Sequence, residues 1–79
     1  MQLEIITPDK KVFAGEATAV TLPGTEGRFQ ILDNHAALVS TIGQGIITVE
    51  GNGKETFTID GGVVEVLNNK VLVLAEAIL

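Results

Sequence analysis

The chain contains no cysteine, no tryptophan and no tyrosine, and its single histidine is His35. Without cysteine neither a disulfide nor a thiolate zinc site can form, and one imidazole cannot build a histidine-based metal cluster. A domain below about 80 residues usually needs such a staple or a partner, because its own core is small. We therefore expect this 79-residue chain to bind a partner protein, and we expect no metal centre and no cofactor.

Positive charge is also scarce. Five Lys and Arg side chains stand against ten Asp and Glu, which gives a net charge of −5. The five cations are scattered, and three Phe are the only aromatic residues. Binding to nucleic acid needs clustered cations for the phosphates and aromatic platforms for the bases, so the composition argues against nucleic acid as a partner. The same charge argues against adhesion to anionic lipid.

Long apolar runs are missing. No run approaches the roughly 18 residues that indicate a membrane-spanning helix. The first residues, Met1–Glu4, lack the basic region of a signal peptide and the arginine bias of a transit peptide. We expect no direct membrane insertion and a cytosol-facing location.

The sequence is instead rich in β-branched residues. Val, Ile and Thr supply 25 of the 79 residues, and such side chains favour the pleated surface of a sheet. Turn residues recur at short intervals, which is typical of an all-β sandwich or barrel. We predict one domain over residues 1–79, with strands near 2–7, 11–14, 16–22, 28–32, 37–41, 45–50, 54–60, 62–67 and 70–75.

Three turns are predicted from local residue types. The loop 51–53, Gly-Asn-Gly, separates two strand-like segments and indicates a hairpin. The pair Asn68-Asn69 suits a tight turn, because Asn tolerates positive φ. Pro23-Gly24 predicts a third turn, since Pro fixes φ and Gly permits positive φ.

Two segments, 63–67 and 71–75, are apolar at almost every position. In a sandwich this small, one face of each sheet forms the core and the other meets solvent unless something covers it. The segments therefore predict either central strands beneath a loop or a protein-docking face. Our candidates for the docking face are Val63, Leu67, Leu72 and Leu74.

Evidence for catalysis is weak. Asp33 lies two residues before His35 in a predicted turn, but no third member of a catalytic set can be named. A structural histidine, bonded to the backbone, is the plainer interpretation, and a hydrolase is the minor one. Lys54 follows the Gly-Asn-Gly turn and suggests a lipoyl- or biotinyl-type carrier, although it lies past the turn. The carrier, or another ligand-binding β-sandwich, is our alternative function.

Two ordered blocks carry a family resemblance. The first runs P-G-x-E-G from Pro23 to Gly27, followed by H-A-x-L from His35 to Leu38. The second runs G-G-x-x-E-V from Gly61 to Val66, followed by V-x-V-L-A from Val71 to Ala75. In this order and spacing the chain resembles the N-terminal β-sandwich domain of the epsilon subunit of F-type ATP synthases, called delta in mitochondria.

The resemblance implies a small β-sandwich of about ten short, mostly antiparallel strands, without catalysis of its own. It implies a rotor subunit that clamps the gamma subunit to the membrane c-ring, peripheral to the cytoplasmic face of the membrane. Val63, Leu67, Leu72 and Leu74 would then face gamma. The residues carried over as ring-facing are Thr25, Glu26, Arg28, Asp33, Asn34 and His35.

The sequence departs from the family pattern in places. Gln30, Asp33-Asn34 and Ala37 stand where the family often has Gly, Pro-Gly and Pro. The usual subunit also continues into a C-terminal helical hairpin that can inhibit ATP hydrolysis and, in some members, binds ATP. The sequence ends at Leu79, directly after the last predicted strand. We expect neither hairpin-type inhibition nor an ATP site within these residues.

Overall fold

The computed structural model describes residues 1–79 and confirms a small, mostly antiparallel β-sandwich, with nine strands where about ten were expected. It contains no helix long and apolar enough to cross a membrane. The strands are β1 (Gln2–Ile6), β2 (Lys11–Glu16), β3 (Ala19–Gly24), β4 (Gly27–Leu32), β5 (Leu38–Ile42), β6 (Gly45–Glu50), β7 (Lys54–Ile59), β8 (Gly62–Leu67) and β9 (Lys70–Ala75).

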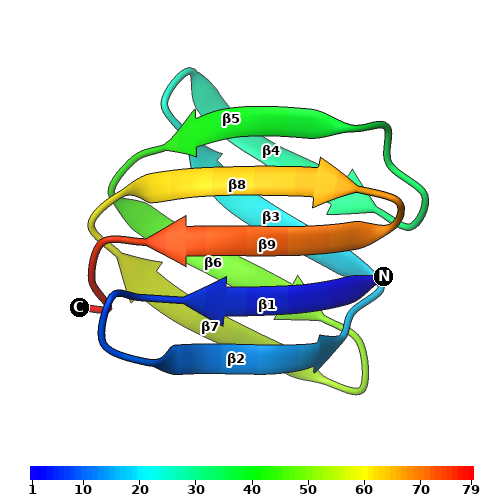
Figure 1. The fold of residues 1–79 in the computed structure, drawn as a ribbon, viewed down its shortest axis with the longest axis horizontal. Helices are drawn as coiled ribbons and strands as arrows, with labels where there is room; N and C mark the ends of the chain where they lie inside the picture. Colours follow the sequence, from blue (N-terminus) through cyan, green and yellow to red (C-terminus); the bar gives the residue numbers. More distant parts are fainter.

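The strands form two layers (Figure 1). The front sheet has the order β2-β1-β9-β8-β5, and the back sheet has the order β4-β3-β6-β7. A single residue pair, Gly24 with Ile42, joins β3 to β5 and links the layers. All strand pairs are antiparallel except β1 and β9, which run in the same direction at the centre of the front sheet.

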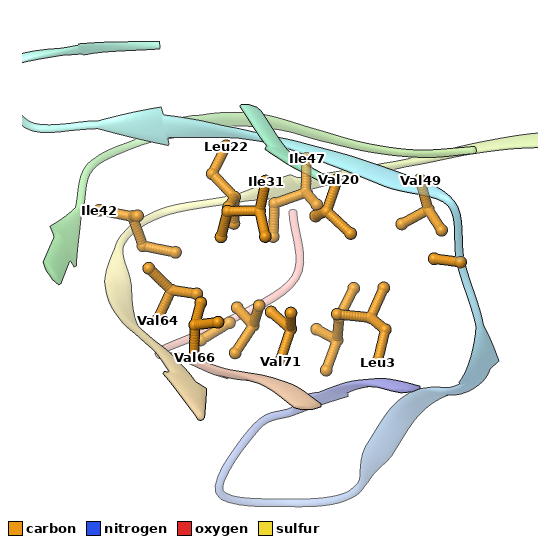
Figure 2. Close-up of a cluster of buried hydrophobic side chains, with 14 of the residues drawn as sticks. Leu3, Val20, Leu22, Ile31, Ile42, Ile47, Val49, Val64, Val66 and Val71 are labelled. Atoms are coloured by element: carbon orange, nitrogen blue, oxygen red, sulfur yellow. The ribbon is translucent and has the colours of Figure 1, made fainter. Parts of the chain in front are cut away.

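The core lies between the layers and is built from inward-facing residues of every strand except β2 (Figure 2). No polar or charged side chain is buried. Burying one large aliphatic side chain contributes roughly 1.5–3 kcal/mol, so this layer supplies the main stabilising term. The back sheet contributes Val20, Leu22, Ile31, Ile47 and Val49, and the front sheet contributes Leu3, Val64, Val66 and Val71, among others.

The alternation determines which side chains of the two apolar strands point outward. In β8, Val64 and Val66 are buried, so the residues between them belong to the outer face. In β9, Val71 and Val73 are buried in the same way. All four candidates for a docking face therefore point away from the core: Val63, Leu67, Leu72 and Leu74.

One predicted strand boundary was wrong. The sequence suggested a break at Ala14-Gly15, but β2 continues through Gly15, which pairs with Leu3 of β1. The chain leaves the sheet at Ala17 and Thr18 instead. Their amides donate to the carbonyls of Met1 (2.9 Å) and Glu50 (2.7 Å). The break falls there because these bonds replace the ladder at the point where the chain crosses between sheets.

The predicted turn at Pro23-Gly24 was also wrong. Both residues belong to β3, pairing with Arg28 and Gly27, and the two-residue turn is Thr25-Glu26. The carbonyl of Pro23 accepts from the Gly43 amide at 2.7 Å, on the side of β3 that faces away from β4. Because N–H and C=O of a strand residue point to the same side, the missing N–H of proline costs β4 no hydrogen bond.

The other two predicted turns are confirmed. Glu50 pairs with Lys54 across the loop 51–53, in which Gly53 has a φ of 144°. Leu67 pairs with Lys70 across Asn68-Asn69, whose φ angles are 50° and 61°. Two successive positive φ angles define a type I′ turn, the geometry that matches the twist of a hairpin.

Candidate functional site

The outer face of the front sheet carries an unusual number of apolar side chains. We call it the outer apolar face, defined by Ile6, Val39, Val63, Leu67, Leu72 and Leu74. Cross-strand register places Leu74 between Val63 and Ile6, so one apolar row crosses three strands. Val39 is 72% exposed and Leu67 is 60% exposed. Isolated exposed apolar residues are ordinary, whereas apolar side chains that lie side by side across three strands make this face a candidate interaction surface.

Charged groups are interspersed in this face. Leu72 lies between Glu65 and Glu4, and Lys11 pairs with Glu4 at 2.9 Å. Beside β5 and β8 the surface is hollowed into a groove lined mainly by apolar residues, among them Ala37, Val39 and Leu67.

The outer face of the back sheet has a different composition. A row of Gln30, Thr21, Thr48 and Thr56 crosses its four strands in register. Its exposed large apolar residues are Leu32 in β4 and Ile46 in β6, which are 54% and 46% exposed. The two outer faces of the sandwich therefore differ in chemistry, with aliphatic side chains on the front and hydroxyls on the back.

The first group of residues predicted to face a ring lies at the β3–β4 turn. Thr25 and Glu26 form the turn and are exposed, and the Thr25 hydroxyl lies 3.1 Å from the Thr41 hydroxyl. Arg28 belongs to β4 rather than to a loop. Its guanidinium crosses the back sheet and donates to the Ile46 carbonyl at 2.8 Å.

The second group lies in the connection between β4 and β5. The α-ammonium of Met1 donates to the Asp33 carboxylate and to the Ala17 carbonyl, at 2.9 Å to the latter. The Asn34 amide donates to the Asn69 side-chain oxygen at 2.7 Å. His35 is exposed, and its Nδ1–H donates to the Ala36 carbonyl at 2.8 Å.

These two groups lie at opposite ends of the edge strand β4 (Figure 1). A strand of six residues is about 20 Å long, so the groups cannot form one compact site. β4 pairs only with β3, and its other edge has no strand partner. The six residues therefore lie at the two ends of one edge of the sandwich, and together we call them the polar strip.

The minor functional hypotheses receive no geometric support. Asp33 is held by Met1 rather than by His35, and His35 is bonded to backbone as the structural interpretation predicts. Lys54 lies in the β6–β7 ladder opposite Glu50, one position after the loop. The modified lysine of a carrier domain would stand at the tip of such a turn.

Sequence reasoning missed several residues of these surfaces. Val39 is the most exposed large apolar residue, and its place in a predicted strand carried no signal of the face to which it points. Ile6 joins the apolar row only through the parallel pairing of β1 with β9. Asn69 contacts Asn34 across 35 residues of sequence, which no local pattern indicates.

Comparisons with known proteins agree on one family. Residues 1–79 match the family described as "ATP synthase, Delta/Epsilon chain, beta-sandwich domain". The chain is 45% identical over 78 residues to the ATP synthase epsilon chain of Sulfurimonas denitrificans. The aligned region covers 96% of this chain and 60% of that protein. It is also 45% identical over 78 residues to that of Pelotomaculum thermopropionicum, covering 96% and 58%. The chain thus spans about 60% of the length of these relatives.

Solved structures share the fold. A chain in the Euglena gracilis mitochondrial ATP synthase structure, which contains OSCP, F1 and the c-ring, superposes with a TM-score of 0.89 and 26% identity. The match covers 98% of this chain and 51% of that one. A chain of the Tetrahymena thermophila central stalk and c-ring structure gives a TM-score of 0.87 at 16% identity, covering 99% and 64%.

Proposed function

Because the chain belongs to the delta/epsilon β-sandwich family of ATP synthase, we propose that it serves as a non-catalytic subunit of the rotor. In this role it binds the gamma subunit and the membrane c-ring, and it helps to couple ion translocation to ATP synthesis. The observation that carries the proposal is the outer apolar face, which gives a small sandwich a second hydrophobic surface outside its core.

The outer apolar face is the proposed contact with gamma. An antiparallel sheet with one solvated face normally carries polar residues there. Here β8 and β9, two inner strands of the front sheet, carry Val63, Leu67, Leu72 and Leu74 on that face. A partner that covers these side chains would remove apolar surface from water. Each Å² removed in this way contributes a favourable free energy of roughly 25 cal/mol. The same contact would supply the stabilisation that a domain of this size needs.

The polar strip along β4 is the proposed contact with the c-ring. Thr25, Glu26 and Arg28 occupy one end of the strip, and Asp33, Asn34 and His35 occupy the other. A contact that includes both ends runs along the edge strand, over about 20 Å. Its exposed charges are Glu26, Asp33 and Arg28, and exposed ion pairs contribute only about 0–1 kcal/mol each. The strip therefore gives orientation, while the apolar face gives most of the affinity.

The proposed role uses no catalytic group, metal or cofactor. It places the chain at the membrane surface as a peripheral part of the complex, on the cytoplasmic face. Attachment would be through proteins, because the net charge of −5 disfavours contact with anionic lipid.

Titration of the folded chain with purified gamma subunit tests the proposal. We expect one-to-one binding that Leu74→Glu weakens about 30-fold or more, as expected when a buried interface anchor is lost. Ile46→Glu is the matched control, because Ile46 has similar exposure (46% against 37%) but lies on the opposite face. Calorimetry gives the affinities, and circular dichroism checks that both variants remain folded.

Two results would count against this role. Equal weakening by both substitutions would contradict the assignment of the front sheet as the gamma contact. An absence of binding at micromolar concentration by the folded chain would favour the carrier alternative, which predicts a mass shift at Lys54 after expression with a ligase.

A further inference from the structure

The connection between β4 and β5 is held by Asn69, a residue of the β8–β9 turn. Asn69, in the β8–β9 turn of the front sheet, accepts the Asn34 amide on its side-chain oxygen at 2.7 Å. Its own carbonyl accepts the Gln2 amide at 3.1 Å. Asn69 thus joins three segments at one end of the sandwich: the start of β1, the β8–β9 turn and the connection that follows β4 (Figure 1).

Asn69 lies in a regular hairpin turn, whereas Asn34, the residue that it binds, lies outside regular secondary structure. Asn69 has a φ of 61° within a type I′ turn, and the residues on either side of that turn, Leu67 and Lys70, pair with each other across the hairpin. Asn34 has a φ of 62° and lies outside any strand. Its amide has no place in a β-ladder, so the Asn69 side chain supplies the acceptor that regular structure would otherwise provide.

We propose that Asn69 is a positioning residue that fixes the Asp33-Asn34-His35 turn for contact with the ring. The ring contact itself rests on the proposed function, whereas the tether between Asn69 and Asn34 does not. Asp33 has a second restraint in the Met1 ammonium, so the turn is fixed at two successive residues. The far end of the polar strip, at Glu26, has no link to Asn69 and serves as an internal reference.

Glycine substitutions isolate the tether. Asn69→Gly removes the side-chain acceptor, and glycine keeps the positive φ without strain. Asn68→Gly is the matched control, because Asn68 has a φ of 50° in the same turn and its side chain makes no hydrogen bond. Asn69→Asp restores an acceptor oxygen and should rescue the loss.

Amide exchange of Asn34, followed by NMR, reads out the tether directly. The net free energy of a hydrogen bond of this kind changes the equilibrium between the closed and open states of the amide by a factor of about two to ten. We therefore expect Asn69→Gly to accelerate exchange of the Asn34 amide by about that factor. Asn68→Gly and Asn69→Asp should leave it near the parent rate. Equal exchange in the Asn69→Gly and Asn68→Gly variants would overturn the inference, whatever the chain binds.

Cross-linking in the assembled rotor reads out the positioning. The chain contains no cysteine, so His35→Cys or Glu26→Cys introduces its single thiol. With a thiol-reactive cross-linker, we expect Asn69→Gly to lower the yield of ring cross-links from His35→Cys and to leave that from Glu26→Cys unchanged. An unchanged yield at both positions would overturn the positioning role alone. An absence of ring cross-links in the parent background would overturn it together with the proposed ring contact.

Discussion

Among the glycines of the chain, Gly62 is the one at which an added Cβ would make the shortest contact. It begins β8 with a φ of 157°, and it pairs with Ala75 of β9 and Ile42 of β5. A Cβ built on it would lie 2.1 Å from the Leu74 carbonyl oxygen and 3.0 Å from the Ala75 Cα. Both obstacles are backbone atoms of a central strand, so they cannot move without disturbing the ladder between β8 and β9.

We predict that Gly62→Ala lowers the free energy of unfolding by about 3 kcal/mol, the upper range for overpacking. Gly15→Ala is the control, since a Cβ there meets only the Phe13 ring at 3.6 Å and its φ is ordinary. Denaturant unfolding measures both variants. The assignment fails if the two substitutions have equal effects.

Residue types alone allowed some roles to be predicted and left others hidden. The outer candidates in β8 and β9 were named because both faces of each segment are apolar, a property visible in the sequence. Which alternate set is buried depends on the register with β1 and β5, which is a tertiary property. The role of Asn69 depends on a partner 35 residues away and carries no local pattern.

At the scale of elements, an aromatic pair joins the two sheets at one side. Phe13 of β2 and Phe57 of β7 have ring centroids 5.9 Å apart and planes at 68°, an edge-to-face arrangement. β2 and β7 are the terminal strands of their sheets on that side, opposite the edge formed by β4 and β5. The pair thus closes one side of the sandwich, and the Gly24–Ile42 pairing joins the layers at the opposite side.

A double-mutant cycle measures this closure. We predict a coupling of about 0.5–1.5 kcal/mol between Phe13→Leu and Phe57→Leu, as for other aromatic pairs. Phe29 lies in β4 at the opposite edge, so Phe13→Leu and Phe29→Leu should be additive within about 0.5 kcal/mol. Additivity in the first pair, measured by denaturant unfolding, would show that the contact contributes nothing beyond burial.

The elements that were predicted correctly are those whose signals are local. The turns at 51–53 and Asn68-Asn69 contain the residues that positive φ requires, and both lie where expected. The Pro23-Gly24 prediction failed because turn propensity was outweighed by pairing with β4. The edge location of β4 could not be predicted, because it depends on which strands become neighbours.

For the whole molecule, charge and exposed apolar surface act together on solubility. The pI is about 4.5, and near that pH repulsion between copies vanishes. The outer apolar face then favours association of the isolated chain. We predict a solubility minimum near pH 4.5 by light scattering. Leu67→Gln should make the minimum shallower without moving it, because it changes apolar surface and not charge. A minimum of unchanged depth would argue against this face as the site of association.

The layout of the two candidate surfaces depends on the complete strand order of the molecule. The predicted strand 28–32 separates Thr25-Glu26 from Asp33-Asn34-His35, and the structure places these two groups on either side of β4, with Arg28 inside the strand. Their arrangement as an extended strip follows from β4 having one neighbour, which requires the complete strand order. The difference between the aliphatic front and the hydroxyl-rich back likewise emerges only after nine strands are assigned to two layers.

The parallel pair at the centre of the front sheet constrains the order of folding. Gln2 lies beside Lys70, so β1 meets β9 only after nearly the whole chain has been looped back. Closing so long a loop is entropically costly, and topologies of this kind fold on the order of milliseconds to seconds. During synthesis, β1 emerges before β9, and it has no partner on the edge that faces β9 until β9 has also emerged. That edge of β1 therefore stays unpaired while the residues between the two strands are synthesised, and the front sheet is complete only once β9 has been added.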